Sequence, residues 1–156
     1  MKSQRNYIIE TGARPEEYQI IRMPRISGLR RLKLFKIDGS QIRDLPGDVF
    51  RNLPELKFLH IANSNLKKID SGVLESLNSL QMANFTNNQI SWIHSRAFRY
   101  MKSLTELSFS GNRIKDSVTV GRAVQAVKGL RSLDVSHNQV RALGLNSTFF
   151  GHPEKT

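Results

Sequence analysis

The chain contains no cysteine among its 156 residues. This absence excludes a disulfide framework, a thiolate zinc site and a cysteine nucleophile. No run approaches the roughly 18 apolar residues of a membrane-spanning helix. The N-terminal region offers only the apolar trio at residues 7–9, where a signal peptide would carry about 7 to 15 apolar residues. These absences leave the compartment open, because a cytosolic protein and a piece of a secreted protein would share them.

Acidic residues are also scarce, since 13 Asp and Glu stand against 24 Lys and Arg, for a net charge of +11. Such an excess favours solubility and attraction to anionic partners, but it does not specify a fold. The hydrophobic fraction is 38%, which is enough for a continuous core in one domain of this length.

The dominant positive feature is an internal repeat. An alternating apolar pair, a polar pair and a further aliphatic residue recur from residues 35, 59, 83, 107 and 133, at spacings of 24, 24, 24 and 26. The five segments read FKIDGSQI, LHIANSNL, ANFTNNQI, LSFSGNRI and LDVSHNQV. One short alternating strand cannot bury its apolar face alone. We therefore expect the units to stack into a parallel sheet with one coil per repeat.

The full pattern, LxxLxxLxLxxNxLxxLxxxxFxx, resembles the leucine-rich repeat family. The segment LPGDVF at residues 45–50 resembles the 24-residue subtype typical of extracellular animal proteins. The resemblance covers roughly residues 26–150. It implies an α/β repeat solenoid that is curved, with a parallel β-sheet on the concave face and irregular or short helical segments on the convex side.

We divide the chain into an N-terminal segment with a partial repeat, five repeats and a tail, at residues 1–28, 29–150 and 151–156. Residues 1–17 fit no repeat, whereas Tyr18, Ile21 and Ile26 fall near the phases of a partial unit. Secreted members of the family usually carry cysteine-rich caps, and these are absent here. We therefore interpret the chain as a piece of a longer protein.

An asparagine column follows the strands at Asn88, Asn112 and Asn138, whereas Ser40 and Ser64 occupy it in the first two units. An asparagine amide can satisfy several backbone groups that a turn leaves unpaired. Serine is shorter and has one donor, so we predict a weaker ladder at the N-terminal end. Ordinary drift within a tolerant repeat is the alternative.

The fourth unit is longer and contains DSVTVGRAVQAVKGL at residues 116–130. Val120, Val124 and Val127 have helical spacing, and Ser117 or Thr119 is a candidate cap. We predict a short helix that fills the convex side; a binding edge is the alternative.

No constellation for catalysis is present, and we predict no enzymatic activity, cofactor or metal site. The four histidines fall at unrelated positions, and Asp38 and Asp134 lie on strands four units apart. At about 4.8 Å per strand, these two carboxylates are too distant to act as an acid–base pair. The sequence also lacks a phosphate-binding glycine loop and a metal-spaced cluster.

The outward residues of each strand offer a binding surface. Leu34, Phe58 and Met82 form an apolar stripe on adjacent strands, and exposed apolar patches usually mark interaction sites. The trailing outward row reads Asp38, Ala62, Thr86, Ser110 and Ser136. The alternative is that a terminal segment or a missing flank covers the stripe. We predict a protein ligand on the concave face, bound by Leu34, Lys36, Phe58, His60, Met82, Asn84 and Glu106.

A second row, one residue after the turn aliphatic, is basic in four of five units: Arg43, Lys67, Lys115 and Arg141, with Ser91 between. Such a ladder suits a glycosaminoglycan or, less favoured, a nucleic acid. Solvated side chains on a repeat edge are the simpler interpretation. Two N-glycosylation sequons begin at Asn84 and Asn146; both can also be chance tripeptides.

We therefore predict a non-catalytic protein-recognition module of an extracellular or cell-surface leucine-rich repeat protein. The alternatives are a cytoplasmic adaptor of the same fold and a polyanion-binding protein acting through the basic row. Fold alone does not choose among them, and the oligomeric state is left open.

Overall fold

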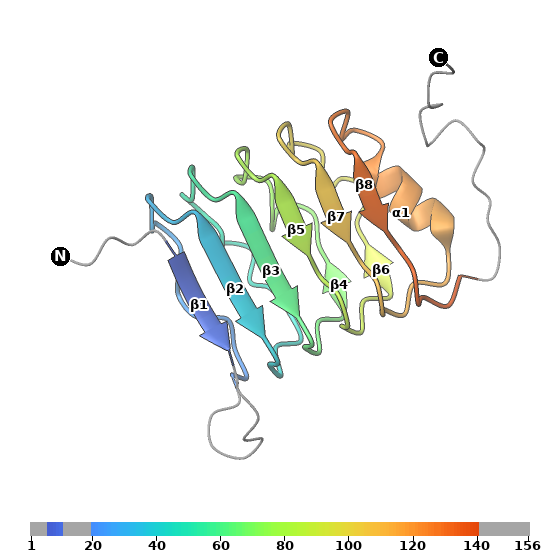
Figure 1. Ribbon diagram of the computed structural model, residues 1–156, viewed down its shortest axis with the longest axis horizontal. Coiled ribbons are helices and arrows are strands. Elements are labelled where there is room, and N and C mark those ends of the chain that lie inside the picture. Colours follow the sequence, from blue (N-terminus) through green and yellow to red (C-terminus); the bar gives the residue numbers. More distant parts are fainter. Residues whose placement is uncertain (1–5, 11–19, 141–156) are drawn as a thin grey trace.

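Six short strands form one parallel sheet in the computed structural model, which describes the backbone of residues 6–10 and the full residues 20–140. The strands follow one another across the sheet in chain order (Figure 1). They are β1 (Asn6–Glu10), β2 (Leu34–Asp38), β3 (Phe58–Ala62), β5 (Met82–Asn84), β7 (Glu106–Ser108) and β8 (Ser132–Asp134). The predicted solenoid with a parallel sheet is confirmed.

The register of the sheet follows the repeat. Leu34 pairs with Phe58, Phe58 with Met82, Met82 with Glu106, and Glu106 with Ser132. Because side chains alternate along a strand, residues of equal repeat position form straight rows across the sheet. The rows predicted from the sequence are therefore rows in space.

β1 extends the sheet by one strand, in parallel register with Asn6 opposite Leu34. This spacing of 28 residues differs from the usual 24, which explains why a search for the repeat missed β1. Ile20 occupies the place that Leu66 and Ile90 hold in later coils, because its carbonyl accepts from Gln41 N at 2.8 Å. Ile20 packs against the core, whereas Ile21 is 66% exposed. Of the residues that fall near the phases of a partial unit, Ile26 is fully buried, whereas Ile21 faces solvent.

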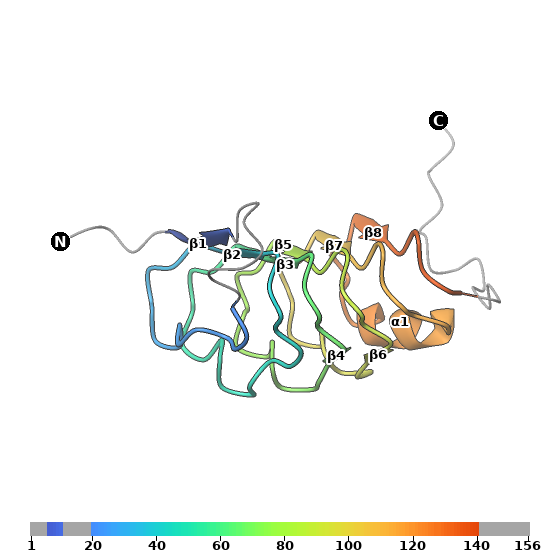
Figure 2. The same cartoon turned by 90° about the horizontal axis from the view of Figure 1, so that it is seen from below.

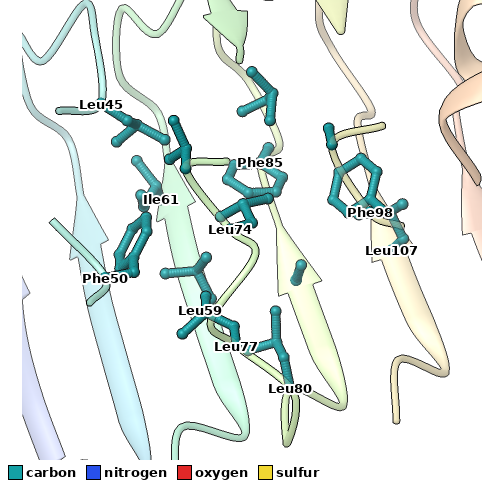
Figure 3. Packing of buried hydrophobic residues seen from close by; sticks show 14 of the residues in the cluster. Leu45, Phe50, Leu59, Ile61, Leu74, Leu77, Leu80, Phe85, Phe98 and Leu107 are labelled. Carbon is teal, nitrogen blue, oxygen red and sulfur yellow. The ribbon is translucent and has the colours of Figure 1, made fainter. Parts of the chain in front are cut away.

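The core is one continuous column of aliphatic and aromatic side chains contributed by every coil. Figure 3 shows a part of it, including Phe50, Phe85 and Phe98. Phe85 stacks on Phe109 at 5.5 Å between ring centroids, and Phe98 meets the same ring edge-on at 5.9 Å. Each fully buried large apolar side chain stabilises the fold by about 1.5–3 kcal/mol. No coil buries its strand alone, so stability depends on neighbouring coils.

The side opposite the sheet is formed by short segments: β4 (Lys68–Ile69), β6 (Trp92–Ile93) and the helix α1 (Ser117–Val124) (Figure 2). The predicted helix is confirmed, since its Val120 and Val124 are buried against the core. Neither predicted cap is correct. Asp116 caps the helix, and its Oδ1 accepts from Val118 N at 2.8 Å. Ser117 is instead a buried first-turn residue.

Candidate functional site

The face of the six-stranded sheet that points away from the core, here called the sheet face, carries the predicted apolar stripe. Leu34 is half-buried there, while Phe58 and Met82 keep exposed fractions of 38% and 36%. The three lie in register on β2, β3 and β5. Among the described residues nothing buries Phe58 or Met82, so neither is a core residue. The same row continues into the exposed Glu106 and Ser132.

Next to the stripe, Asp38 is the centre of a polar cluster on the sheet face. Its Oδ2 lies 3.7 Å from Lys36 Nζ and 3.7 Å from His60 Nε2, and its Oδ1 accepts from Asn63 Nδ2 at 2.6 Å. The carboxylate therefore offsets the Lys36 charge. Lys36 and His60 were predicted as binding residues, but their link through Asp38 was not predicted from the sequence.

The middle outward row of the sheet face also shapes the turns that follow the strands; it consists of Lys36, His60, Asn84, Ser108 and Asp134. Asn84 Oδ1 accepts from Thr86 N at 2.8 Å, and Asp134 Oδ1 accepts from Ser136 N at 2.9 Å. Hydrogen bonds from Ser136 lower the pKa of the Asp134 carboxyl. The oxygen of Asn84 is thus engaged within its own turn. Asx turns of this kind are readable from sequence, but these turns were not among the predictions.

Ala62 corrects one prediction. It was expected to face outward with the trailing row, yet it is only 3% exposed. Its strand neighbour is Asp38, and the next residue, Asn63, donates from its backbone N to Thr86 O at 3.0 Å. A single methyl group between longer side chains is shielded from water. Alternation predicts the direction of a side chain, not its exposure.

A column of left-handed residues, missed in the sequence, closes the turns beside the sheet face. It consists of residues with φ between 49° and 73°: Gly39, Asn63, Asn87, Gly111 and His137. Asn87 Nδ2 donates to Asn63 Oδ1 at 3.0 Å. At Gly111 an added Cβ would collide with Asn87 Oδ1, so another residue would require that side chain to move, and the positive φ of 69° also favours glycine. Recurrent Gly and Asn at one repeat position is the signal that would have found this column.

The predicted basic row lies on one flank of the solenoid. Arg43, Lys67 and Lys115 are all exposed, and Lys67 N donates to Arg43 O at 3.1 Å between neighbouring coils. Arg141 lies outside the described residues. The row is interrupted by Ser91, and beside it Trp92 is 44% exposed. Trp92 meets His94 edge-on at 5.7 Å between centroids. The sequence did not single out Trp92.

The sequon at Asn84 lies within the folded sheet. Phe85 is fully buried, and Thr86 Oγ1 shares a hydrogen bond of 2.9 Å with Ser108 Oγ. The hydroxyl of the sequon is therefore engaged in the folded chain. The second sequon, at Asn146, lies outside the described residues.

Titratable groups are dispersed along the solenoid. Asp38 and Asp134 lie at the ends of β2 and β8, with β3, β5 and β7 between them. At about 4.8 Å per strand they are on the order of 19 Å apart. In the part of the chain that the structure describes, no group of three or more His, Asp or Glu is placed to hold a metal ion. Over the same residues, no helix has the length and apolarity needed to cross a membrane.

Comparisons with known proteins agree with this geometry. The model of the family described as "Leucine rich repeat" matches residues 30–90, 55–114 and 84–140. Among solved structures, the chain is similar to that of TLR13 in the crystal structure of a TLR13–ssRNA13 complex. The identity is 29% over 78% of this chain and 17% of that chain, with a TM-score of 0.73.

It is also similar to an internalin (inlF) from Listeria monocytogenes, with 26% identity over 69% of this chain and 29% of that chain, and a TM-score of 0.53. The matched region spans less than a third of either solved chain. No curated protein sequence is similar enough to count as a relative.

Proposed function

Since the chain belongs to the leucine-rich repeat family, we propose that it is a non-catalytic recognition module that binds a protein ligand on its sheet face. The observation that carries the proposal is the apolar stripe of Leu34, Phe58 and Met82. Two of these side chains remain more than a third exposed although the core beneath them is complete. Aromatic residues and methionine are enriched in protein interfaces.

Covering the stripe would be energetically significant. Fully burying a Phe or Met side chain contributes about 1.5–3 kcal/mol, and the exposed part of each residue offers a fraction of that. Lys36, His60 and Asn84 lie in the next row and provide polar groups around the apolar centre. An apolar centre within a polar rim is the usual anatomy of a protein interface.

We place the module in an extracellular or cell-surface protein, because the segment LPGDVF matches the subtype typical of such proteins. A cytoplasmic adaptor is the alternative. Expressing the chain behind a signal peptide in animal cells would test this proposal. Secreted, folded protein with a glycan mass at Asn146 supports the extracellular assignment, while retention and aggregation would contradict it.

The binding test is a double variant, Phe58→Ser with Met82→Ser, assayed against an array of cell-surface ectodomains. We expect binding to be lost while the circular dichroism spectrum stays intact. Trp92, the only tryptophan of the chain, lies on the opposite side and reports on folding through its emission. The matched control is Tyr100→Ser with Val118→Ser. Tyr100 and Val118 lie off the sheet face, and their exposed fractions are 47% and 40%. Binding that survives the sheet-face variant would refute the proposal.

A second candidate function is polyanion binding through the basic flank of Arg43, Lys67 and Lys115. Two observations favour it: these exposed cations occupy the same repeat position on one flank, with Arg43 and Lys67 on neighbouring coils, and the similar protein TLR13 forms a complex with ssRNA13. Such binding should weaken steeply with salt. Lys67→Glu with Lys115→Glu should abolish heparin binding at low salt, whereas Lys102→Glu with Lys128→Glu should not. Absent or salt-insensitive heparin binding would remove this candidate.

A further inference from the structure

We propose that the ligand segment docked on the apolar stripe is acidic, and that its carboxylates lie over the edge where β2 and β3 begin. This inference deepens the proposed function and rests on it. It is carried by the distribution of charge on either side of the stripe.

The edge before the stripe is strongly basic. Four cations lie just before β2 and β3, here called the basic edge: Arg30, Arg31, Lys33 and Lys57. Lys33 O accepts from both Lys57 N, at 2.9 Å, and Phe58 N, at 3.1 Å. The two lysines are therefore neighbours, and each directly precedes a stripe residue. Glu55 is the acidic residue nearest to them in sequence.

The cations of the basic edge are not offset within the described part of the chain, where none of the four forms an ion pair with a carboxylate. Three are exposed and Lys33 is half-buried. Their stems can line the apolar stripe while the charged ends stay in water. A carboxylate from a ligand would find several donors converging on it.

The other side of the stripe differs. Lys36 follows Leu34 and Phe35, but its ammonium lies 3.7 Å from Asp38, which Asn63 also binds. Among the described residues, the positive charge that no carboxylate offsets is thus on the side where the strands begin. This asymmetry sets an orientation for the ligand, with apolar groups over Phe58 and Met82 and acidic groups over Lys33 and Lys57.

The charge also changes along the sheet face. In β5 and β7 the positions equivalent to Lys33 are held by the neutral Gln81 and Thr105. On the face itself the outward Glu106 and Asp134 are acidic at this far end, while Arg131 precedes β8 and Lys102 and Lys128 lie along its edge. A basic ligand would meet repulsion beside the stripe, so the surface selects against it.

The test is selection of a random peptide library, displayed on phage, against the folded chain. We expect the selected peptides to combine aromatic or aliphatic residues with Asp and Glu. Their affinity should fall about tenfold in Lys33→Glu with Lys57→Glu, and should decrease with salt. The control, Lys102→Glu with Lys128→Glu, makes the same charge change at the same edge beside β7 and β8. It should change affinity less than about twofold.

The outcomes separate the two proposals. Peptides that need Phe58 and Met82 but show no acidic enrichment, or that tolerate the Lys33 and Lys57 reversal, would overturn the acidic ligand and leave the binding face standing. Peptides that still bind the double variant Phe58→Ser with Met82→Ser would overturn both the binding face and the acidic ligand. Self-association of the chain that is lost in the same serine variant would identify a second copy as the occupant, and would also overturn this inference.

Discussion

The column of inward-facing polar residues after the strands, here called the ladder, has asparagine at its C-terminal end and serine at its N-terminal end. The two ends make different hydrogen bonds between coils. Asn112 reaches back to the preceding coil, where Ile90 N donates to its Oδ1 at 2.9 Å and Phe85 O accepts from its Nδ2 at 2.8 Å. Its Nδ2 also donates to Phe109 O in its own coil at 2.9 Å. Asn88 and Asn138 repeat this arrangement. Each amide therefore ties two coils together.

The serine side chains are shorter and reach fewer groups of the neighbouring coil. Ser40 N donates to Ser64 Oγ at 3.1 Å, and the two hydroxyls are 2.8 Å apart. Ser64 Oγ donates to Ala62 O in its own coil. Ile42 N, the equivalent of Ile90 N, has only the local Ser40 Oγ, at 3.3 Å. The comparison shows that side-chain length decides how far a ladder residue reaches into the preceding coil: Ser64 reaches only Ser40, whereas Asn112 reaches Ile90 N and Phe85 O. Leu34 and Phe58 of the stripe lie on this less strongly tied end.

The largest expected effect comes from removing an amide of the ladder. Asn112→Ala leaves Ile90 N, Phe85 O and Phe109 O without their partner, and buried unpaired groups are costly, so we expect a loss of about 3 kcal/mol. Urea unfolding followed by Trp92 emission measures it. Asn78→Ala, at an exposed asparagine, is the control. Equal losses in the two variants would contradict the role of the ladder.

A smaller effect is expected at the serine end. Ser64→Ala removes the bonds to Ser40 and to Ala62 O, which are fewer than those of Asn112. We expect a loss of about 1 kcal/mol in the same urea experiment. A loss as large as that of Asn112→Ala would show that the two ends are equally dependent on their ladder residues.

Restoring an asparagine at the serine end should raise the stability of the fold. Ser64→Asn places an amide where the repeat would let it reach Ile42 N and Ile37 O, so we expect a gain of about 0.5–1 kcal/mol. Hydrogen exchange at Ile42 N should slow in this variant. Unchanged exchange together with unchanged stability would mean that the neighbouring Ser40 prevents the asparagine geometry.

The smallest effect concerns acid. The pKa of Asp134 lies below its ordinary value of 3.8 in the folded chain, because Ser136 hydrogen-bonds the carboxylate. A lowered pKa stabilises the fold above the unfolded value, and this contribution is lost as the pH falls through the folded pKa. Between pH 5 and about pH 3, Asp134→Asn should therefore lose slightly less stability than the unchanged chain does. An identical decrease would show that the Ser136 bonds do not depend on charge.

Much of the candidate site followed from sequence. The outward direction of Phe58 and Met82, the rows across the sheet and the serine positions in the ladder all follow from a fixed repeat and from alternation. Their role in binding remains a prediction. The missed features were those in which the spacing changes, as at β1, or in which one side chain has two roles, as with Asn84 and Asp134.

The sequence by itself determined the family, the parallel sheet and the phase of the core positions within the regular repeats, because periodicity fixes which side chains are buried when equal units stack. Only the tertiary structure decided which outward residues are accessible and which charges are compensated. Ala62 is covered and Lys36 is offset by Asp38, while no described carboxylate offsets Lys33 or Lys57. The neighbours of Ala62 and Lys33 belong to the adjacent coil, 24 residues away along the chain, and the distance between Lys36 and Asp38 on one strand forms only in the folded sheet.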